Sequence, residues 1–225
     1  DIKIDARNHL WLLDDQNFLY RFHPENNKFH RFTSQTAPVQ NIFTLSDGDT
    51  WLFQSDGRLL RITPDEQAMT CRQILGSSNG VRRVISLVQD KEIIWIISDK
   101  GIYKYSKENS KLTLALSTRK HFHSFRKYAN KFIIGADNGQ LYIYDPRKDD
   151  YSIMKFNTSA TLTRVKAYDS KHLLITAEND GFFLTDGYRG EGVHYTISNQ
   201  LLSNEVNALY VEDSQKHIWI AYKNT

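Results

Sequence analysis

The 225-residue sequence contains little cysteine, proline or glycine, and it has no long apolar run. Its single cysteine, Cys71, excludes an intrachain disulfide and a cysteine-rich zinc site. Four prolines and 11 glycines are too few for a collagen-like or low-complexity chain. The longest apolar stretch, Ile93–Ile97, has five residues, whereas a membrane-spanning helix needs about 20. These absences leave a globular protein, or a segment of one.

An excess of charge of one sign is also missing. Lys and Arg number 29 and Asp and Glu number 26, which gives a net charge of +3. A charge this small and evenly spread does not indicate a nucleic-acid partner. The N-terminal residues 1–5 lack the basic head and apolar run of a signal peptide. Both ends of the sequence fall inside strand-like patterns, so we expect the chain to be part of a longer polypeptide.

A repeat of about 40 residues organises the chain. A strongly apolar strand recurs, and its anchor residues lie 40, 44, 38, 42 and 44 positions apart. The anchors are Trp11, Trp51, Trp95, Ile133, Ile175 and Trp219. Six positions after the first five anchors come the turn residues Asn17, Gly57, Gly101, Gly139 and Gly181. A tryptophan flanked by Ile or Leu on a central strand is typical of a core, so we expect the Trp anchors to be buried.

Four short strands per repeat, without helical periodicity between them, are typical of the blades of a β-propeller. A βαβ fold would need helical stretches of about 10–15 residues between the strands. The sequence therefore predicts an all-β propeller of four-stranded antiparallel blades, with little helix. The predicted blades cover about residues 1–34, 38–75, 80–117, 120–157 and 161–198, and a half blade covers 203–225.

Two segments of the predicted half blade resemble a known family. Residues 202–213 have an Asn-x-Val start and a strand that ends in Glu-Asp, and residues 217–221 form a Trp-Ile strand. This pattern resembles the two-component regulator propeller repeat, whose next strand is similar to residues 101–105. The similarity extends over the whole chain. The units at 121–156 and 161–197 depart from it, because both lack the tryptophan.

The resemblance implies a function. Such repeats form the periplasmic sensor of hybrid two-component systems in polysaccharide-degrading bacteria, where a seven-bladed propeller precedes a membrane span, a histidine kinase and a response regulator. It implies that this chain is the non-catalytic, extracytoplasmic part of an inner-membrane protein. The implied partner is an oligosaccharide or another small polar ligand, and the full-length protein would be a homodimer. Neither a cofactor nor a metal is implied.

The first strand of each propeller blade lines the central channel, so polar residues at its start are candidate ligand contacts. A ring of amide and guanidinium donors suits hydroxyl-rich or carboxylated ligands. The predicted ligand-binding residues, two of them from a neighbouring loop, are Asn41, Arg83, His121, His123, Arg164, Asn207, Tyr188 and Arg189. The alternative is that these positions are polar only because the mouth of a channel is wet.

Other functions stay open at this point. His121 and His123 alternate on one strand, but no third ligand has a suitable spacing, so no metal site is predicted. No Gly-x-Ser-x-Gly motif is present, and no catalytic residue can be named. A propeller lyase acting on a polysaccharide or an ester, and a protein-binding scaffold, remain the alternatives to a sensor.

The half blade at 203–225 supplies only a first and a second strand. An apolar strand without a neighbour recruits another strand or aggregates. We therefore expect the half blade to be completed by the remainder of its own polypeptide or by a second copy of the chain.

Overall fold

The computed structural model describes residues 2–32, 37–64, 69–189, 192–212 and 214–223. Strands make up 58% of the structure, compared with roughly 20–25% in an average globular protein. The described residues include no α-helix, and their two 3₁₀ turns are η1 (Ser77–Asn79) and η2 (Ile197–Asn199). None of the helices in this described part is long and apolar enough to span a membrane.

The chain divides into two compact units, residues 1–117 and 118–225. The first unit holds three four-stranded antiparallel sheets, and each follows the order of the sequence. Their strands are β1 (Ile2–Ile4), β2 (Leu10–Leu13), β3 (Leu19–His23), β4 (Lys28–Arg31), β5 (Val39–Thr44), β6 (Thr50–Gln54), β7 (Leu59–Pro64), β8 (Met69–Leu75), β9 (Val84–Asp90), β10 (Ile93–Ser98), β11 (Gly101–Ser106) and β12 (Lys111–Ser117).

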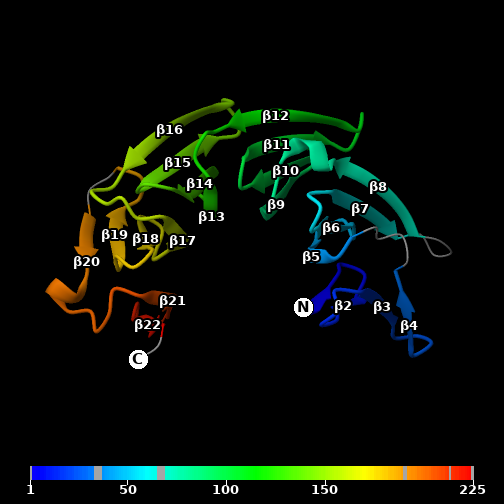
Figure 1. Cartoon of the computed structure of the whole chain (residues 1–225), viewed down its shortest axis with the longest axis horizontal. Coiled ribbons are helices and arrows are strands. Elements are labelled where there is room, and N and C mark those ends of the chain that lie inside the picture. Colours follow the sequence, from blue (N-terminus) through cyan, green and yellow to red (C-terminus); the bar gives the residue numbers. More distant parts are fainter. Residues whose placement is uncertain (1, 33–36, 65–68, 190–191, 213, 224–225) are drawn as a thin grey trace. The chain divides into compact units, whose positions relative to one another are not determined.

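The second unit holds two four-stranded sheets and one two-stranded sheet, again in sequence order (Figure 1). Their strands are β13 (Phe122–Tyr128), β14 (Lys131–Ala136), β15 (Gln140–Asp145), β16 (Asp150–Lys155), β17 (Leu162–Ala167), β18 (His172–Ala177), β19 (Phe182–Asp186), β20 (Gly192–Tyr195), β21 (Val206–Val211) and β22 (Ile218–Tyr222). These sheets confirm the predicted propeller fold.

The turns between the second and third strands explain the regular spacing of Gly and Asn. Asn17, Gly57, Gly139 and Gly181 have φ angles of 62°, 85°, 63° and 67°. These angles lie in the left-handed region, which glycine enters without steric cost and asparagine tolerates. A left-handed residue thus recurs at four of the five described turns between a second and a third strand, and Gly101, at the fifth, has a φ of 154°.

The second strands form the cores of the sheets. Every residue of β6 is buried, and β10, β14 and β18 are buried except at their first residue. Trp51 of β6 packs edge-on against Tyr105 of β11, with ring centroids 5.7 Å apart. Both rings belong to one apolar cluster that joins neighbouring sheets of the first unit. β6 is apolar on both faces because a sheet packs on each of them: Leu52 joins the cluster that contains Trp11 of the first sheet, and Trp51 joins the cluster that contains Tyr105 of the third.

The two-stranded sheet differs from this pattern. Residues of β22 alternate between half-buried and exposed, and the Trp219 side chain is 61% exposed. The expectation that every Trp anchor is buried is therefore wrong for Trp219. The reason is that β22 pairs only with β21 in the described part of the chain, and no sheet covers the face that carries Trp219. The expected completion of this sheet by further polypeptide stays a prediction.

Candidate functional site

In five sheets the first strand has an irregularity at its N-terminal end, which we call its leading end. In each, the pairing with the second strand shifts by one residue, which is a β-bulge. Bulges redirect side chains and are frequent next to binding sites. The extra residues are Gln40, Ile85, His123, Thr163 and Asn207. The predicted residues His123 and Asn207 occupy bulges, and Asn41 and Arg164 directly follow them.

One backbone hydrogen bond recurs beside every bulge. The residue after the second strand donates its N–H to the carbonyl of the residue two positions before the bulge, over 2.8–3.3 Å. The donors are Ser55, Asp99, Asp137, Glu178 and Lys223, and their acceptors are Pro38, Arg83, His121, Thr161 and Glu205. This bond places the side chain after each second strand next to the leading end of the first strand. Four of the five side chains brought there are charged.

A pocket of about 190 Å³ lies between two of these leading ends in the second unit. It contains the predicted residues Arg164 of β17 and Asn207 of β21, both with exposed side chains. Its lining residues are Thr163, Arg164, Glu178, Asn179, Glu205, Val206, Asn207 and Lys223. Two cations and two carboxylates balance one another, and Val206 is the only apolar residue in the lining. The pocket is therefore polar and close to neutral.

The walls of this pocket are held by hydrogen bonds. Glu178 donates its N–H to the carbonyl of Thr161 over 2.9 Å, and Lys223 bonds the carbonyl of Glu205 over 3.0 Å. The Gly181 N–H crosses to the carbonyl of Asn204 over 3.0 Å, which links the β18–β19 turn to the segment before β21. The segment before β21 and the β18–β19 turn are thus hydrogen-bonded to each other, and both line the pocket.

His121 and His123 share one carboxylate, that of Asp137. The Asp137 carboxylate accepts the backbone N–H of His121 over 2.9 Å and lies 2.6 Å from Nε2 of His123. Burial opposes ionisation of Asp137, but these two hydrogen bonds outweigh it and lower its pKa below the ordinary value. Asp137 Oδ2 also lies 3.6 Å from Nδ1 of His121. The two imidazoles therefore converge on one anion, although His123 is a bulge residue.

The leading end of β13 lies beside that of β17, because the Ser124 hydroxyl donates to the carbonyl of Leu162 over 3.1 Å. Figure 1 shows the two strands next to each other. The His121, His123 and Asp137 group and the Arg164 pocket thus occupy neighbouring leading ends of one unit.

Two predicted residues belong to the first unit. Asn41 follows the bulge of β5 and is half-buried. Arg83 precedes β9, and its backbone N–H donates to the buried Asp99 carboxylate over 3.2 Å, beside that of Arg82 over 3.1 Å. Asp99 and Asp137 therefore cap the leading ends of their blades in the same way.

Tyr188 and Arg189 do not join the other predicted residues. They lie in the β19–β20 turn, which is at the opposite end of the strands from the bulges. There they line a separate pocket of about 450 Å³ with Tyr128, Ala129, Ser170, Lys171, Asp186 and Gly187. The expectation that this loop adds to the leading ends is wrong, because antiparallel strands place successive turns at alternate ends of a sheet.

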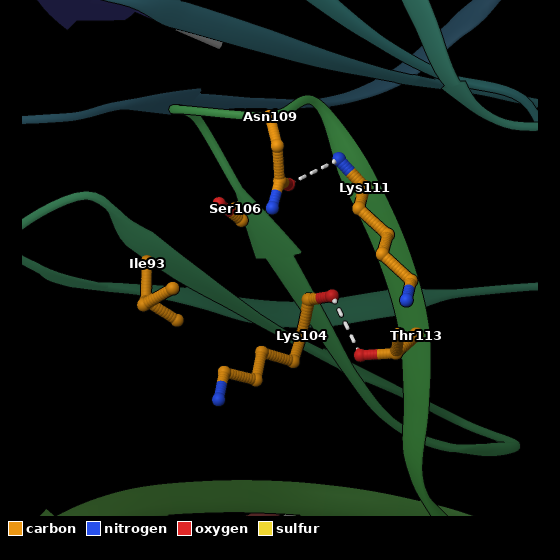
Figure 2. A pocket seen from close by; sticks show the side chains of 6 residues that line it. All are labelled: Ile93, Lys104, Ser106, Asn109, Lys111 and Thr113. Carbon is orange, nitrogen blue, oxygen red and sulfur yellow. Dashed lines mark hydrogen bonds between the residues drawn. The ribbon is translucent and has the colours of Figure 1, made fainter.

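A third pocket, of about 270 Å³, lies on one face of the β10–β12 sheet (Figure 2). Its lining residues are Ile93, Lys104, Ser106, Asn109, Lys111 and Thr113. The Asn109 side chain accepts the Lys111 N–H over 3.0 Å, and Lys104 Nζ lies 5.6 Å from the Trp95 ring centre. None of the predicted site residues contributes to it.

Sequence reasoning missed two charged residues that line the Arg164 pocket, Glu178 and Lys223. A signal for both is present in the repeat, because each directly follows a second strand, as Asp99 and Asp137 do. Aligning the repeats on that position, rather than on the first strand alone, would have found them.

The solved structures that share the fold of this chain include two that match nearly all of it. One is the extracellular domain of BT4673 from B. thetaiotaomicron, described as a candidate one-component system, with 15% identity over 99% of this chain and a TM-score of 0.69. The other is PorZ of Porphyromonas gingivalis, a surface component of the type-IX secretion system, with 13% identity over 98% of this chain and a TM-score of 0.69. Identities this low establish a common fold alone.

This chain matches 31% of the length of the first structure and 37% of the second. It therefore spans about a third of each of the proteins that it resembles. No family model matches the sequence, and no curated protein matches it.

Proposed function

We propose that this chain is part of an extracytoplasmic sensor propeller that binds the end of a glycan in the Arg164 pocket. One observation carries the proposal: the pocket joins Arg164, which follows the bulge of β17, and Asn207, which is the bulge residue of β21. Both residues were predicted as ligand contacts from their places at the starts of first strands. The shared fold with the extracellular domain of BT4673 supports a sensory role. In this proposal the chain belongs to the two-component regulator propeller repeats of a seven-bladed periplasmic domain.

The chemistry of the pocket favours a ligand rich in hydroxyl groups. A hydroxyl both donates and accepts hydrogen bonds, so it can pair with Glu178 or Glu205 and also with Arg164 or Asn207. The balance of two cations and two carboxylates gives no net attraction for a polyanion. At about 190 Å³ the pocket is smaller than the roughly 300–1,000 Å³ that drug-sized ligands occupy. It suits one sugar ring at the end of a chain, with or without a single carboxylate.

Sensing without catalysis is the simplest use of this site. A balanced set of hydrogen-bonding groups fixes the orientation of a ligand, and binding can shift the chain between two conformations in proportion to its differential affinity for them. The signal would pass to a kinase domain in another part of the polypeptide. A lyase and a protein-binding scaffold are the alternatives that the same experiment distinguishes.

Isothermal titration calorimetry with a panel of neutral and acidic oligosaccharides tests this proposal. We expect Arg164→Ala to weaken the binding of the best ligand by about 1.5–3 kcal/mol, because a charge-assisted hydrogen bond is lost. Asn207→Ala should cost about 0.5–1.5 kcal/mol, as expected for a neutral hydrogen bond. Both side chains are exposed, so stability should change little.

Arg189→Ala is the matched control, because Arg189 lies at the opposite strand ends and its side chain is 79% exposed. Its affinity should equal that of the unaltered chain. Equal affinities for Arg164→Ala and the unaltered chain would exclude this pocket as the site. Turnover of a glycan would indicate a lyase, and absence of binding across the panel would favour the scaffold.

A further inference from the structure

Three histidines gather on one face of the first sheet. His9 precedes β2 and lies opposite His23, because the β2–β3 register pairs the adjacent residues Leu10 and Phe22. The His9 and His23 ring centroids are 5.3 Å apart, and those of His23 and His30 are 5.1 Å apart. Residues 9, 23 and 30 have no regular spacing in the sequence, so only the pairing of β2, β3 and β4 brings them together.

A carboxylate completes the group. The β3–β4 turn carries Glu25, whose Oε1 lies 3.6 Å from Nδ1 of His23. One ligand atom from each of His9, His23 and Glu25 lies within 4.8 Å of the others. Donors around a tetrahedral zinc ion, with Zn–N bonds of about 2.0–2.1 Å, are separated by about 3.4 Å. The His23–Glu25 pair already has nearly this separation, and His9 needs a shift of about 1 Å or slightly more.

Asp5 fixes the orientation of His9. The buried Asp5 carboxylate accepts the backbone N–H groups of Arg7 and His9 and the indole N–H of Trp11, each over 2.9 Å. Its Oδ2 also lies 3.2 Å from Nδ1 of His9. A histidine whose Nδ1–H donates to a carboxylate presents the Nε2 lone pair, as metal-binding histidines commonly do.

Arg21 lies against both nitrogens of the His9 ring. Its guanidinium Nη2 lies 2.9 Å from Nδ1 and 2.8 Å from Nε2 of His9, and its central carbon lies 5.7 Å from the centre of the Trp11 ring. The guanidinium Nε is buried without a hydrogen-bond partner among the described residues. Arg21 therefore competes with a metal ion for His9.

We propose that His9, His23 and Glu25 bind a divalent transition-metal ion of the zinc class, with Asp5 positioning His9. Two imidazoles and one carboxylate form a ligand set that suits zinc. A fourth position is left for water or for His30, whose ring borders that of His23. The Glu25 side chain is 66% exposed, so an ion can reach the site from solvent. Binding requires Arg21 to release Nε2 of His9.

Zinc ion titrated into the 225-residue chain, in competition with a chromophoric chelator, tests this proposal. We expect one ion per chain, and at least tenfold weaker binding in both His23→Ala and Glu25→Gln. Cobalt ion should give the intense visible absorption of a four-coordinate site in the unaltered chain only. Arg21→Met should bind zinc more tightly than the unaltered chain, because it removes the competitor for His9.

His172→Ala is the matched control. His172 also contacts a carboxylate, that of Asp169 at 2.8 Å, but no second imidazole contacts its ring among the described residues. This variant should bind zinc like the unaltered chain. Absence of saturable binding, or equal affinities for the unaltered chain, His23→Ala and Glu25→Gln, would overturn the proposal. Far-UV circular dichroism ensures that a loss of binding is compared between folded proteins, and Glu25→Gln, at an exposed turn, is the variant least able to disturb folding.

Discussion

Trp51 and Trp219 hold the same position in the repeat but lie in opposite environments. Trp51 faces Phe43 across its strand pair, and Trp219 faces Tyr210 in the equivalent pair. The Trp51 side chain is fully buried, whereas the Trp219 side chain is 61% exposed. The sequence of a blade thus determines where a residue sits in its own sheet. Burial depends on the neighbouring sheet, which a single repeat does not contain.

Replacing the two tryptophans separately gives the largest expected difference. We expect Trp51→Ala to lower the free energy of unfolding by about 3–5 kcal/mol, because it leaves a cavity beside Tyr105 in a packed cluster. Trp219→Ala should cost less than about 1 kcal/mol, as expected for a surface substitution. Urea unfolding followed by far-UV circular dichroism measures both. Equal losses would show that the two positions are buried alike in solution.

The difference between a residue's place in its own sheet and its burial by a neighbouring sheet also explains how much of the fold could be predicted from the sequence. The strand rhythm was readable because second strands are apolar at successive positions and the turns need Asn or Gly with positive φ. The burial of Trp51 followed from this rhythm, and that of Trp219 did not. The alternation of Cys71 with apolar neighbours predicts a packed side chain, but Cys71 is exposed on β8. Periodicity therefore identifies the strands, and only the packing of the sheets decides what is covered.

The residues of the candidate site also divide into those that the repeat pattern identifies and those that only the arrangement of the strands places. Arg164 and Asn207 could be found because each follows or occupies the start of a first strand, a position that the repeat marks. Tyr188 and Arg189 could not be placed, since a loop joining two strands can lie at either end of a sheet until the strands are counted. The cluster of His9 and His23 was invisible in the sequence, because residues 14 positions apart meet only through the β2–β3 register.

Two glycines in turns allow a similar comparison, because their backbone conformations are nearly the same and their surroundings differ. Gly181 has a φ of 67°, and a Cβ there would lie 2.0 Å from the carbonyl oxygen of Tyr195. Gly80 has nearly the same φ, 65°, but a Cβ there would meet no atom within 4 Å. We expect Gly80→Ala to cost about 1–2 kcal/mol from backbone strain alone. Gly181→Ala should cost about 2–4 kcal/mol, because overpacking adds to the strain.

Thermal melts of the two glycine variants provide the measurement. A loss in Gly181→Ala no greater than that in Gly80→Ala would mean that the turn can move away from Tyr195. The surroundings of a residue would then matter less at turns than they do for the tryptophans.

Two groups of ion pairs extend the comparison to charged side chains. Lys107 of the third sheet contacts Asp47 and Asp49 in the β5–β6 turn of the second, and Arg61 donates to Asp49 over 2.7 Å. Arg58 contacts Asp56 two residues away, within a single turn. We expect Lys107→Met to cost about 1–2 kcal/mol, because it leaves two partly buried carboxylates short of a partner. Arg58→Met should cost less, about 0.2–1 kcal/mol, because this half-buried pair lies within one turn.

The smallest effect is the pH dependence of the Asp47 contact. Burial opposes ionisation of Asp47, but the Lys107 ammonium and the Asp49 N–H outweigh it and lower the pKa of Asp47 below its ordinary 3.8. A carboxyl group whose pKa is lower in the folded state stabilises the fold above its unfolded value, and it loses this contribution as the pH falls through the folded value. We therefore expect Asp47→Asn to be less stable than the unaltered chain at pH 7, and the difference to shrink below about pH 4.

Asp56→Asn should show a smaller difference at pH 7, because the Asp56–Arg58 pair joins no second sheet. Urea unfolding of both variants across this pH range measures the two differences. A difference for Asp47→Asn that persists unchanged at low pH would show that the charge of Asp47 contributes nothing to the contact between the two sheets.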